Sequence, residues 1–207
     1  MSAPRQAGGR IHVISGPVGA GKSTELARLI DRERIYYTAI GKDPSTAVVI
    51  LVPAIDTRYD PCGKSLATHA GLILPALSLD NAVPLTSYIT HDHFGSILSE
   101  SNVIALDEGS FFTGLVEFCE HYADIGKTVI VSGVELYSNK LPFGELPRLI
   151  SLAETHQRLS AICMFCGGDA AYTVAVAGNS AVIKVGGSND YKAACRGCHA
   201  IQSKKIH

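Results

Sequence analysis

The sequence predicts an α/β fold in which helices cover a mostly parallel sheet. Two observations indicate this class: short, wholly apolar runs of strand length recur along the chain, and segments with helical spacing of apolar residues separate them. Strands of a parallel sheet are buried on both faces and have this continuous apolar character. With 46% hydrophobic and 18% charged residues among 207, the chain is able to bury a sizeable core.

The predicted elements follow one another in a regular order. Residues 1–9, rich in Ala, Gly and Pro, are expected to form a flexible leader. The apolar runs predict strands at residues 11–14, 47–52, 103–106 and 128–131. Helical spacing predicts helices at residues 23–35, from Leu115 to about Gly126, and at residues 146–159, with a turn-rich break at residues 41–45.

The pattern changes at about Ile162. A β-hairpin is expected there, with strands at residues 172–177 and 181–185 around a turn at 178–180, between two pairs of cysteines. The sequence therefore predicts two domains, an α/β core at residues 10–161 and a smaller domain at residues 162–207.

Composition narrows the class of protein. Lys and Arg number 18 against 19 for Asp and Glu, which argues against the basic face of a nucleic-acid-binding protein. No apolar run approaches the roughly 18 residues of a membrane span, and the first ten residues have no apolar stretch of signal-peptide length. We expect a cytoplasmic protein, in which six cysteines are not a disulfide framework.

A phosphate-binding loop follows the first predicted strand and precedes the first predicted helix. The pattern G-x-x-x-x-G-K-[ST] is matched at every fixed position by Gly16, Pro17, Val18, Gly19, Ala20, Gly21, Lys22 and Ser23. Glycines let backbone N–H groups turn toward phosphate oxygens, and the helix N-terminus favours negative charge. Lys22 is expected to reach the β- and γ-phosphates, and the Ser23 hydroxyl to bind Mg²⁺; a chance glycine-rich turn is the alternative.

An acidic pair ends another predicted strand. Asp107 and Glu108 directly follow the apolar run 103–106, which would bring both to the carboxyl edge of the sheet. A phosphate-binding loop needs a carboxylate there to hold Mg²⁺, and a second carboxylate can accept a hydroxyl proton. The alternative is a strand-end turn with a solvated glutamate.

Four cysteines form two C-x2-C pairs separated by 28 residues, a pattern that favours tetrahedral Zn²⁺. These are Cys163, Cys166, Cys195 and Cys198. Since four thiolates leave no open position, the zinc would be structural; a redox dithiol is the alternative. Cys62 and Cys119 look unpaired, and Cys119 lies on the apolar face of its predicted helix. His91 and His93 flank Asp92, where we expect a solvated loop rather than a metal site.

From Arg10 to His199 the chain resembles the type II (cellular-type) thymidine kinases. The motifs that carry this resemblance are GKSTEL at 21–26, DTRY at 56–59, DEGSFF at 107–112, VEFCE at 116–120, GKTVIV at 126–131, PFG at 142–144, AAYT at 170–173, GG at 186–187, DY at 190–191 and the four cysteines.

The resemblance implies a RecA-like P-loop core, a zinc-binding lasso domain and a homotetramer. It also implies that Mg²⁺ and ATP are used to phosphorylate the 5′-hydroxyl of thymidine, with deoxyuridine as a possible second substrate and thymidine triphosphate as a feedback inhibitor. By position, Glu108 matches the proton acceptor and Asp107 the residue that holds Mg²⁺ through water. Asp56 and Arg58 match residues near the triphosphate.

The resemblance also implies a base pocket. Phe111 and Phe143 match residues around the thymine, and Tyr191 matches a further substrate contact. The lasso segment whose backbone would bind the base consists of Val182, Ile183, Lys184, Val185 and Gly186.

The chain departs from the family pattern at three places. Ser110 stands where the family has Gln, and residues 36–46 form a longer segment than usual. Ser138 stands where the family has an aromatic residue, with Tyr137 one place earlier. Either Tyr137 substitutes through a local shift or the base pocket differs.

Two other functions compete with a deoxynucleoside kinase. One is a nucleic-acid-dependent ATPase with a zinc ribbon, against which the near-zero net charge counts. The other is a nucleotide sensor without catalysis, against which the acidic pair 107–108 counts.

Overall fold

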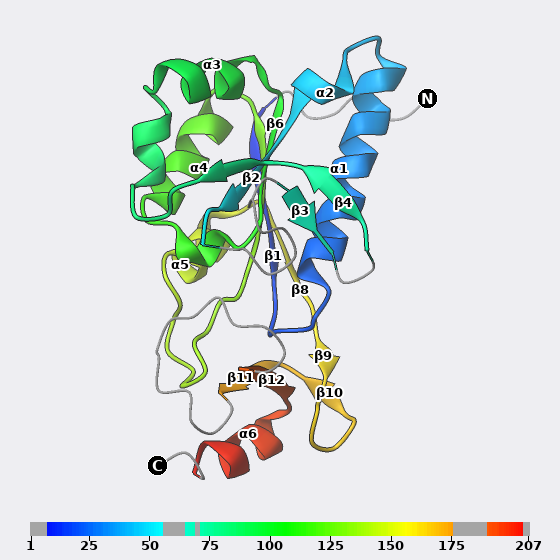
Figure 1. Cartoon of the computed structure of the whole chain (residues 1–207), viewed down its shortest axis with the longest axis vertical. Helices are drawn as coiled ribbons and strands as arrows, with labels where there is room; N and C mark the ends of the chain where they lie inside the picture. Colours follow the sequence, from blue (N-terminus) through cyan, green and yellow to red (C-terminus); the bar gives the residue numbers. More distant parts are fainter. Residues whose placement is uncertain (1–7, 56–64, 69–70, 176–189, 205–207) are drawn as a thin grey trace.

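A computed structural model describes residues 8–55, 65–68, 71–175 and 190–204. Its centre is a six-stranded sheet of strand order β5-β2-β6-β7-β1-β8, in which every pairing is parallel (Figure 1). In chain order these strands are β1 (Arg10–Ser15), β2 (Val48–Pro53), β5 (Leu77–Leu79), β6 (Val103–Leu106), β7 (Thr128–Gly133) and β8 (Thr155–Arg158). The predicted α/β class is confirmed.

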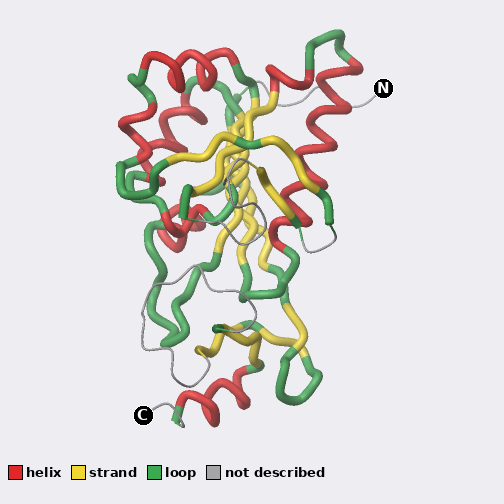
Figure 2. Tube along the Cα trace, in the orientation of Figure 1, coloured by secondary structure: helices red, strands yellow, loops and turns green. Residues whose placement is uncertain are grey.

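Helices cover both faces of this sheet, as the edge-on strands of Figure 2 show. Helix α1 (Lys22–Ala39) packs on one face, and the short α2 (Pro44–Ala47) follows it. On the other face lie α3 (Asp92–Glu100), α4 (Leu115–Asp124), α5 (Leu146–Leu152) and the 3₁₀ turn η1 (Leu85–Tyr88). Apolar strand residues face both layers, which is why the strand sequences do not alternate.

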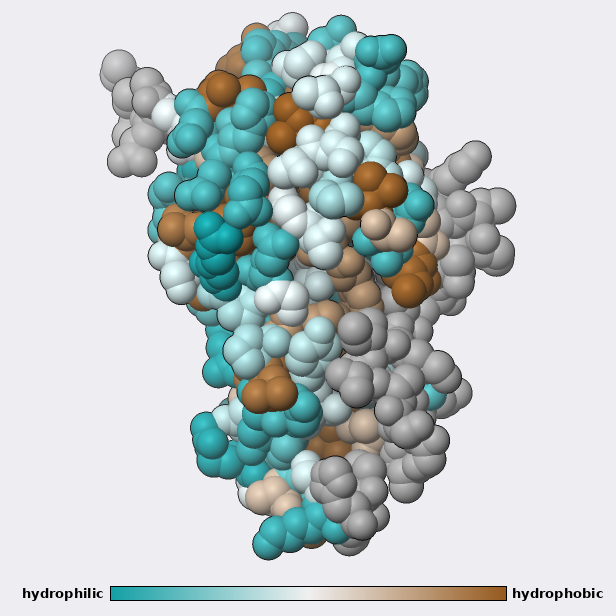
Figure 3. Space-filling view, turned by 90° about the vertical axis from the view of Figure 1, so that its left-hand side faces the viewer, coloured by the Kyte–Doolittle hydropathy of each residue, from teal (hydrophilic) through white to brown (hydrophobic). Residues whose placement is uncertain are grey.

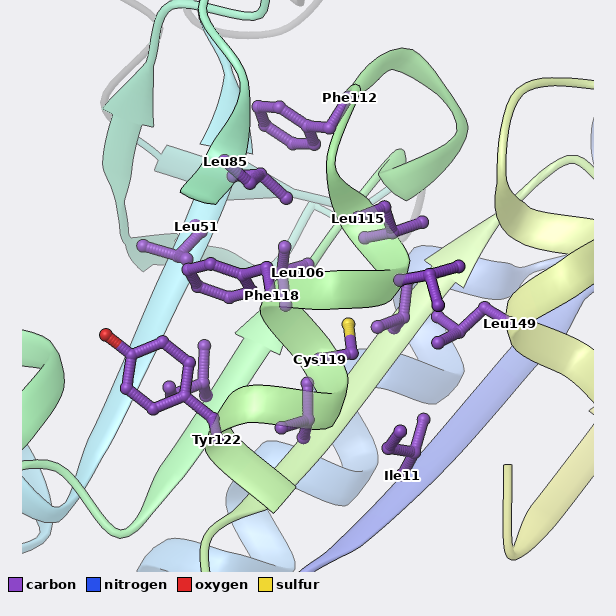
Figure 4. Packing of buried hydrophobic residues seen from close by; sticks show 14 of the residues in the cluster. Ile11, Leu51, Leu85, Leu106, Phe112, Leu115, Phe118, Cys119, Tyr122 and Leu149 are labelled. Atoms are coloured by element: carbon purple, nitrogen blue, oxygen red, sulfur yellow. The ribbon is translucent and has the colours of Figure 1, made fainter. Parts of the chain in front are cut away.

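Helix α4 contributes the centre of the larger hydrophobic cluster. Phe118 and Cys119 are fully buried and point toward strand residues such as Leu106 (Figure 4). Glu145 holds the start of the helix, since its two carboxylate oxygens accept hydrogen bonds from the backbone N–H groups of Gly114 and Val116. The prediction that Cys119 belongs to the core is confirmed, and burial raises the pKa of its thiol.

The outer surface over α3, α4 and α5 is mixed in character. Figure 3 shows apolar residues there as small separate patches among hydrophilic ones. Within the described part of the chain, no helix has the length and apolar character needed to cross a bilayer.

Residues beyond β8 form a small cluster of their own at one end of the sheet (Figure 1). It contains β9 (Ala161–Ile162), β10 (Asp169–Ala170), β11 (Tyr172–Ala175), β12 (Tyr191–Ala194) and α6 (Arg196–Ser203). Strand β11 pairs antiparallel with β12, so the partner of the predicted strand 172–177 is residues 191–194. The predicted turn 178–180 and strand 181–185 lie outside the described residues.

Two predicted elements were wrong. The helix expected over residues 146–159 ends at Leu152, and β8 follows as a parallel edge strand beside β1. Its sequence, THQR, lacks the apolar character of the inner strands because three of its four residues are exposed. The segment 91–93 is not a loop: α3 begins there, with His91 as its N-cap, whose Nδ1 accepts a hydrogen bond from the N–H of Phe94.

Several short elements had no counterpart in the prediction. These are α2, η1, β5, the hairpin of β3 (Ser65–Ala67) with β4 (Ile73–Pro75), the 3₁₀ turn η2 (Gly109–Phe111), β9 and β10. All have four residues or fewer, which is too short to establish a periodic pattern. The longer helices α3 and α6 were not predicted either.

Candidate active site

The phosphate loop joins the carboxyl end of β1 to the first turn of α1. Gly19 has φ of 72° and Gly21, the N-cap of the helix, has φ of 81°. Both angles lie in the left-handed region, which favours glycine. At Gly16, a Cβ would lie 2.6 Å from the carbonyl oxygen of Leu159. The three glycines are thus required by the path of the backbone, and the loop opens toward the N-terminus of α1.

Lys22 is buried at this helix start. Its Nζ donates a hydrogen bond of 2.9 Å to the carbonyl oxygen of Pro17, on the far side of the loop. The ammonium group therefore folds back across the loop that would surround the phosphates. A phosphate oxygen is a stronger partner for this cation than a carbonyl oxygen.

Thr173 connects the phosphate loop to the C-terminal segment. The backbone N–H of Val18 donates to its Oγ1 at 3.2 Å, and the Thr173 side chain is nearly buried on β11. Ala20, also in the loop, packs against the hydrophobic cluster of that segment. The conformation of the loop thus depends in part on residues about 155 positions later in the chain.

Asp107 is buried where β6 ends, beside the loop. Its N–H donates to the carbonyl oxygen of Leu51 on β2, which continues the sheet by one bond. One carboxylate oxygen accepts hydrogen bonds from the Ser132 hydroxyl and from the backbone N–H of Glu108. The carboxylate also interacts with the side chain of Ser23. The side chains of the two residues predicted to hold Mg²⁺ are therefore close enough to interact.

The ionisation of Asp107 is strongly perturbed. Burial, and then the charge of neighbouring Glu108, raise its pKa from 3.8 to about 6, while the hydrogen bonds from Ser132 and Ser23 oppose the rise. A cation bound beside the carboxylate would stabilise its charged form and so lower this pKa.

Glu108 is the next residue and is also buried, at 8% exposure. Its backbone has φ of 50° and ψ of 41°, a left-handed conformation that costs a residue with a side chain about 1 kcal/mol or more. The chain turns sharply here into η2, and Gly109 follows because a Cβ there would lie 2.5 Å from the side chain of Val131. Strain of this kind at a site is often linked to function.

The oxygen groups beside the loop fit Mg²⁺. The Ser23 hydroxyl and the Asp107 carboxylate supply hard oxygen ligands, and this ion takes few protein ligands besides phosphate oxygens and water.

Three aromatic side chains gather near the acidic pair. The ring of Phe143 lies edge-on to Phe111, with centroids 5.2 Å apart, and stacks on Tyr137 at 4.2 Å and 24°. Tyr137 therefore packs on Phe143 directly before position 138, where the family has an aromatic residue. The backbone carbonyl of Ser138 accepts a hydrogen bond from His199 instead.

The Ser110 side chain does not replace the glutamine side chain that the family has at this position. Its hydroxyl donates to the carbonyl oxygen of Val134 at 2.7 Å, and the residue is buried. This side chain supports the backbone that leads to Tyr137 rather than facing a ligand.

An ion pair crosses the end of the sheet between β7 and β8. Arg158 donates from Nε to Glu135 at 2.8 Å and from a second nitrogen to the carbonyl oxygen of Ala171 at 3.3 Å. The pair therefore ties the segment after β7 to the C-terminal segment.

The four cysteines expected to bind zinc lie together. Their sulfur atoms are all within 4.8 Å of one another, and those of Cys166 and Cys195 are 3.8 Å apart. Tetrahedral Zn²⁺ with bonds of about 2.3 Å separates its sulfur ligands by roughly 3.8 Å. Burial opposes ionisation of Cys163, but backbone N–H groups, among them that of Cys195, lower its pKa to about 6. The geometry fits structural zinc.

The remaining predicted site residues are unevenly described. Tyr191 lies on β12, opposite Ala175 of β11. Asp56, Arg58 and the segment from Val182 to Gly186 lie outside the described residues. Sequence reasoning missed Ser132 and His199, whose contacts join residues far apart in the chain, so that no local pattern indicates them.

Comparison with known proteins gives one consistent result. The family model described as "Thymidine kinase" matches residues 9–199. The thymidine kinase of Myxoma virus (strain Lausanne) is 37% identical over 194 residues, covering 93% of this chain and 97% of the viral protein. Human cytosolic thymidine kinase is 36% identical over 197 residues, covering 95% of this chain and 75% of its own length. The thymidine kinase of Yaba monkey tumor virus is 33% identical over 192 residues, covering 92% and 94%.

Proposed function

The chain belongs to the thymidine kinase family, and we propose that it transfers the γ-phosphate of ATP to the 5′-hydroxyl of thymidine. The observation that carries this proposal is the placement of buried Asp107 where its carboxylate interacts with Ser23 of the phosphate loop, with Glu108 directly beyond it. Loop, metal-binding carboxylate and second carboxylate are the three parts that phosphorylation of a hydroxyl requires.

The phosphate loop would bind the triphosphate of ATP. Backbone N–H groups at the start of α1 point toward the loop, and Lys22 would exchange its bond with Pro17 for the β- and γ-phosphates. We assign Asp56 and Arg58 to the same triphosphate, on the family resemblance.

Mg²⁺, when bound, would neutralise charge that develops on the phosphate oxygens. Ser23 and Asp107 would hold it, the latter through water. Ser132 orients the Asp107 carboxylate, because its hydroxyl donates to one oxygen.

Glu108 would act as general base. A buried carboxylate held by the strained turn at the end of β6 has few alternative positions. Such a group can accept the proton of the 5′-hydroxyl as the oxygen attacks the γ-phosphorus, which typically contributes about 10²- to 10⁴-fold in rate.

The aromatic group of Phe111, Phe143 and Tyr137 would form one wall of the nucleoside pocket. Flat, apolar rings suit a pyrimidine base, and the stacked pair leaves ring edges and faces for contact. The backbone of Val182 to Gly186 would bind the base edge, and Tyr191 would add a further contact. Deoxyuridine, which lacks only the methyl group, is the expected second substrate.

Residues 162–207 would form a lasso domain distinct from the core at residues 10–161, with Zn²⁺ on the four cysteines as its structural centre. We further propose a cytoplasmic homotetramer with thymidine triphosphate as feedback inhibitor, on the strength of the family resemblance.

The test is phosphate transfer from ATP to thymidine, with deoxyuridine, deoxycytidine and single-stranded DNA as comparators. We expect thymidine monophosphate to form in the presence of Mg²⁺. Hydrolysis of ATP stimulated by DNA, without any phosphorylated nucleoside, would reject the proposal.

Glu108→Gln tests the assigned base. The amide keeps the size of the side chain but is unable to accept the proton, so kcat should fall by about 10²-fold or more. ATP affinity, measured by calorimetry, should stay within about twofold, because Glu108 is not assigned to the triphosphate. Unchanged turnover would remove Glu108 from this role.

A further inference from the structure

The segment between Glu135 and Phe143 is a tight turn that carries Tyr137. The N–H of Tyr137 donates to the carbonyl oxygen of Leu141 at 2.9 Å, and its own carbonyl oxygen accepts from the N–H of Lys140 at 2.9 Å. Lys140 takes a left-handed φ of 67° to close the turn. The turn is thus internally bonded and should move as a unit.

The tip of this turn is attached to α6. His199, only 4% exposed, contacts the carbonyl oxygen of Ser138 through Nε2 at 2.8 Å. Because a carbonyl only accepts, Nε2 must carry the proton. The other ring nitrogen then accepts from the Ser203 hydroxyl at 3.2 Å. The imidazole is oriented on both sides, and its hydrogen bond fixes the backbone next to Tyr137.

A second contact joins the turn to β11, beside α6. The Nζ of Lys140 lies 4.5 Å from the ring centroid of Tyr172, and that ring lies 5.6 Å from the ring of His199. Loss of the His199 bond alone would therefore loosen the turn without releasing it.

We infer that His199 is a positioning residue for the nucleoside pocket, holding the ring of Tyr137 against Phe143 through the carbonyl of Ser138. The inference rests on the proposed function, in which these rings form a wall of that pocket. It also accounts for the absence of an aromatic side chain at position 138: the turn is held by the backbone of Ser138, and the ring comes from the preceding residue.

The experiment compares His199→Gln with His199→Asn in the full-length protein. The amide nitrogen of Gln reaches about as far as Nε2 and can still donate to Ser138, whereas the shorter Asn falls short of it. We expect Asn to raise KM for thymidine by about 3- to 10-fold, the effect of losing one hydrogen bond, and Gln to stay within about twofold of wild type. KM for ATP should stay within about twofold in both.

Two measurements separate positioning from a general structural effect. Calorimetric affinity for thymidine without ATP should follow the same order as KM, and zinc content should remain about one per chain in both variants. Ile201→Ala is the matched control, since Ile201 lies on the same helix and is 58% exposed.

The outcomes are distinct. Equal thymidine KM values for Asn, Gln and wild type would overturn the inference, as would a rise in the KM for ATP as large as that for thymidine. If the Asn variant loses zinc, Lys140→Met takes its place beside the Gln variant. Lys140→Met removes the other contact of the same turn, so a thymidine KM unchanged in this variant rejects the inference. Failure of wild type to bind or phosphorylate any nucleoside would reject the proposed function instead.

Discussion

The buried carboxylate of Asp107 should destabilise the protein at neutral pH when no metal is present. Asp107→Asn removes the charge and keeps the shape, and the amide oxygen is still able to accept from Ser132 and from the N–H of Glu108. The variant should therefore be more stable than wild type in metal-free buffer, although it lacks a residue that we assign to Mg²⁺.

The magnitude follows from the pKa of Asp107, which burial and the charge of Glu108 raise from 3.8 to about 6. This difference corresponds to about 3 kcal/mol. The pKa is higher in the folded state than in the unfolded state. Below about pH 4 the carboxyl is protonated in both states, and no stability is lost. Between about pH 4 and pH 6 the unfolded state has lost this proton while the folded state keeps it, so stability falls as pH rises; above about pH 6 both states are ionised and the full loss remains.

The assay is thermal unfolding at pH 5 and pH 8 in buffer without Mg²⁺ or nucleotide. For a chain of this size, about 3 kcal/mol corresponds to about 6–12 °C in Tm. We expect the full gain for Asp107→Asn at pH 8 and only about half of it at pH 5, which lies between the two pKa values. Asp31→Asn is the matched control, because Asp31 is exposed on α1. A gain equal at both pH values, or a variant less stable than wild type at pH 8, would refute the reasoning.

Contacts of the C-terminal segment give two further predictions. Thr173→Val leaves the N–H of Val18 without its acceptor and should raise KM for ATP by about 3- to 10-fold, whereas Thr173→Ser keeps the oxygen and should not; steady-state kinetics in which the two variants agree would contradict this. Cys195→Ser should reduce zinc from about one per chain to near zero and lower Tm, as metal analysis and calorimetry would detect; full zinc content in the variant would exclude Cys195 as a ligand.

The parts of the fold that the sequence predicted are those set by local patterns. Inner strands such as β6 and β7 are buried on both faces, so their apolar runs are continuous and easily recognised. The phosphate loop follows from fixed glycine positions, and each cysteine pair lies within four residues. These features need no knowledge of distant contacts.

The parts that were missed depend on neighbours far away in the chain. Strand β8 is a strand only because β1 offers it a free edge, and its sequence THQR has no pattern of its own. The left-handed backbone of Glu108 is imposed by the packing of the strand end and not by its residue type. Ser132 comes 25 residues after its partner Asp107, and His199 comes 61 after Ser138.

The two departures of the sequence from the family pattern in this site concern one structural unit. Ser110 donates to the carbonyl oxygen of Val134, where the turn begins, and His199 holds the carbonyl of Ser138 at its tip. Neither serine side chain replaces the larger residue that the family has at its position. Instead, the Ser110 hydroxyl and the Ser138 carbonyl each bond to a group far away in the chain, and Tyr137 stacks on Phe143 in the pocket wall that we propose. Substrate preference in this chain should therefore depend on how the turn is held as much as on which side chains line the pocket.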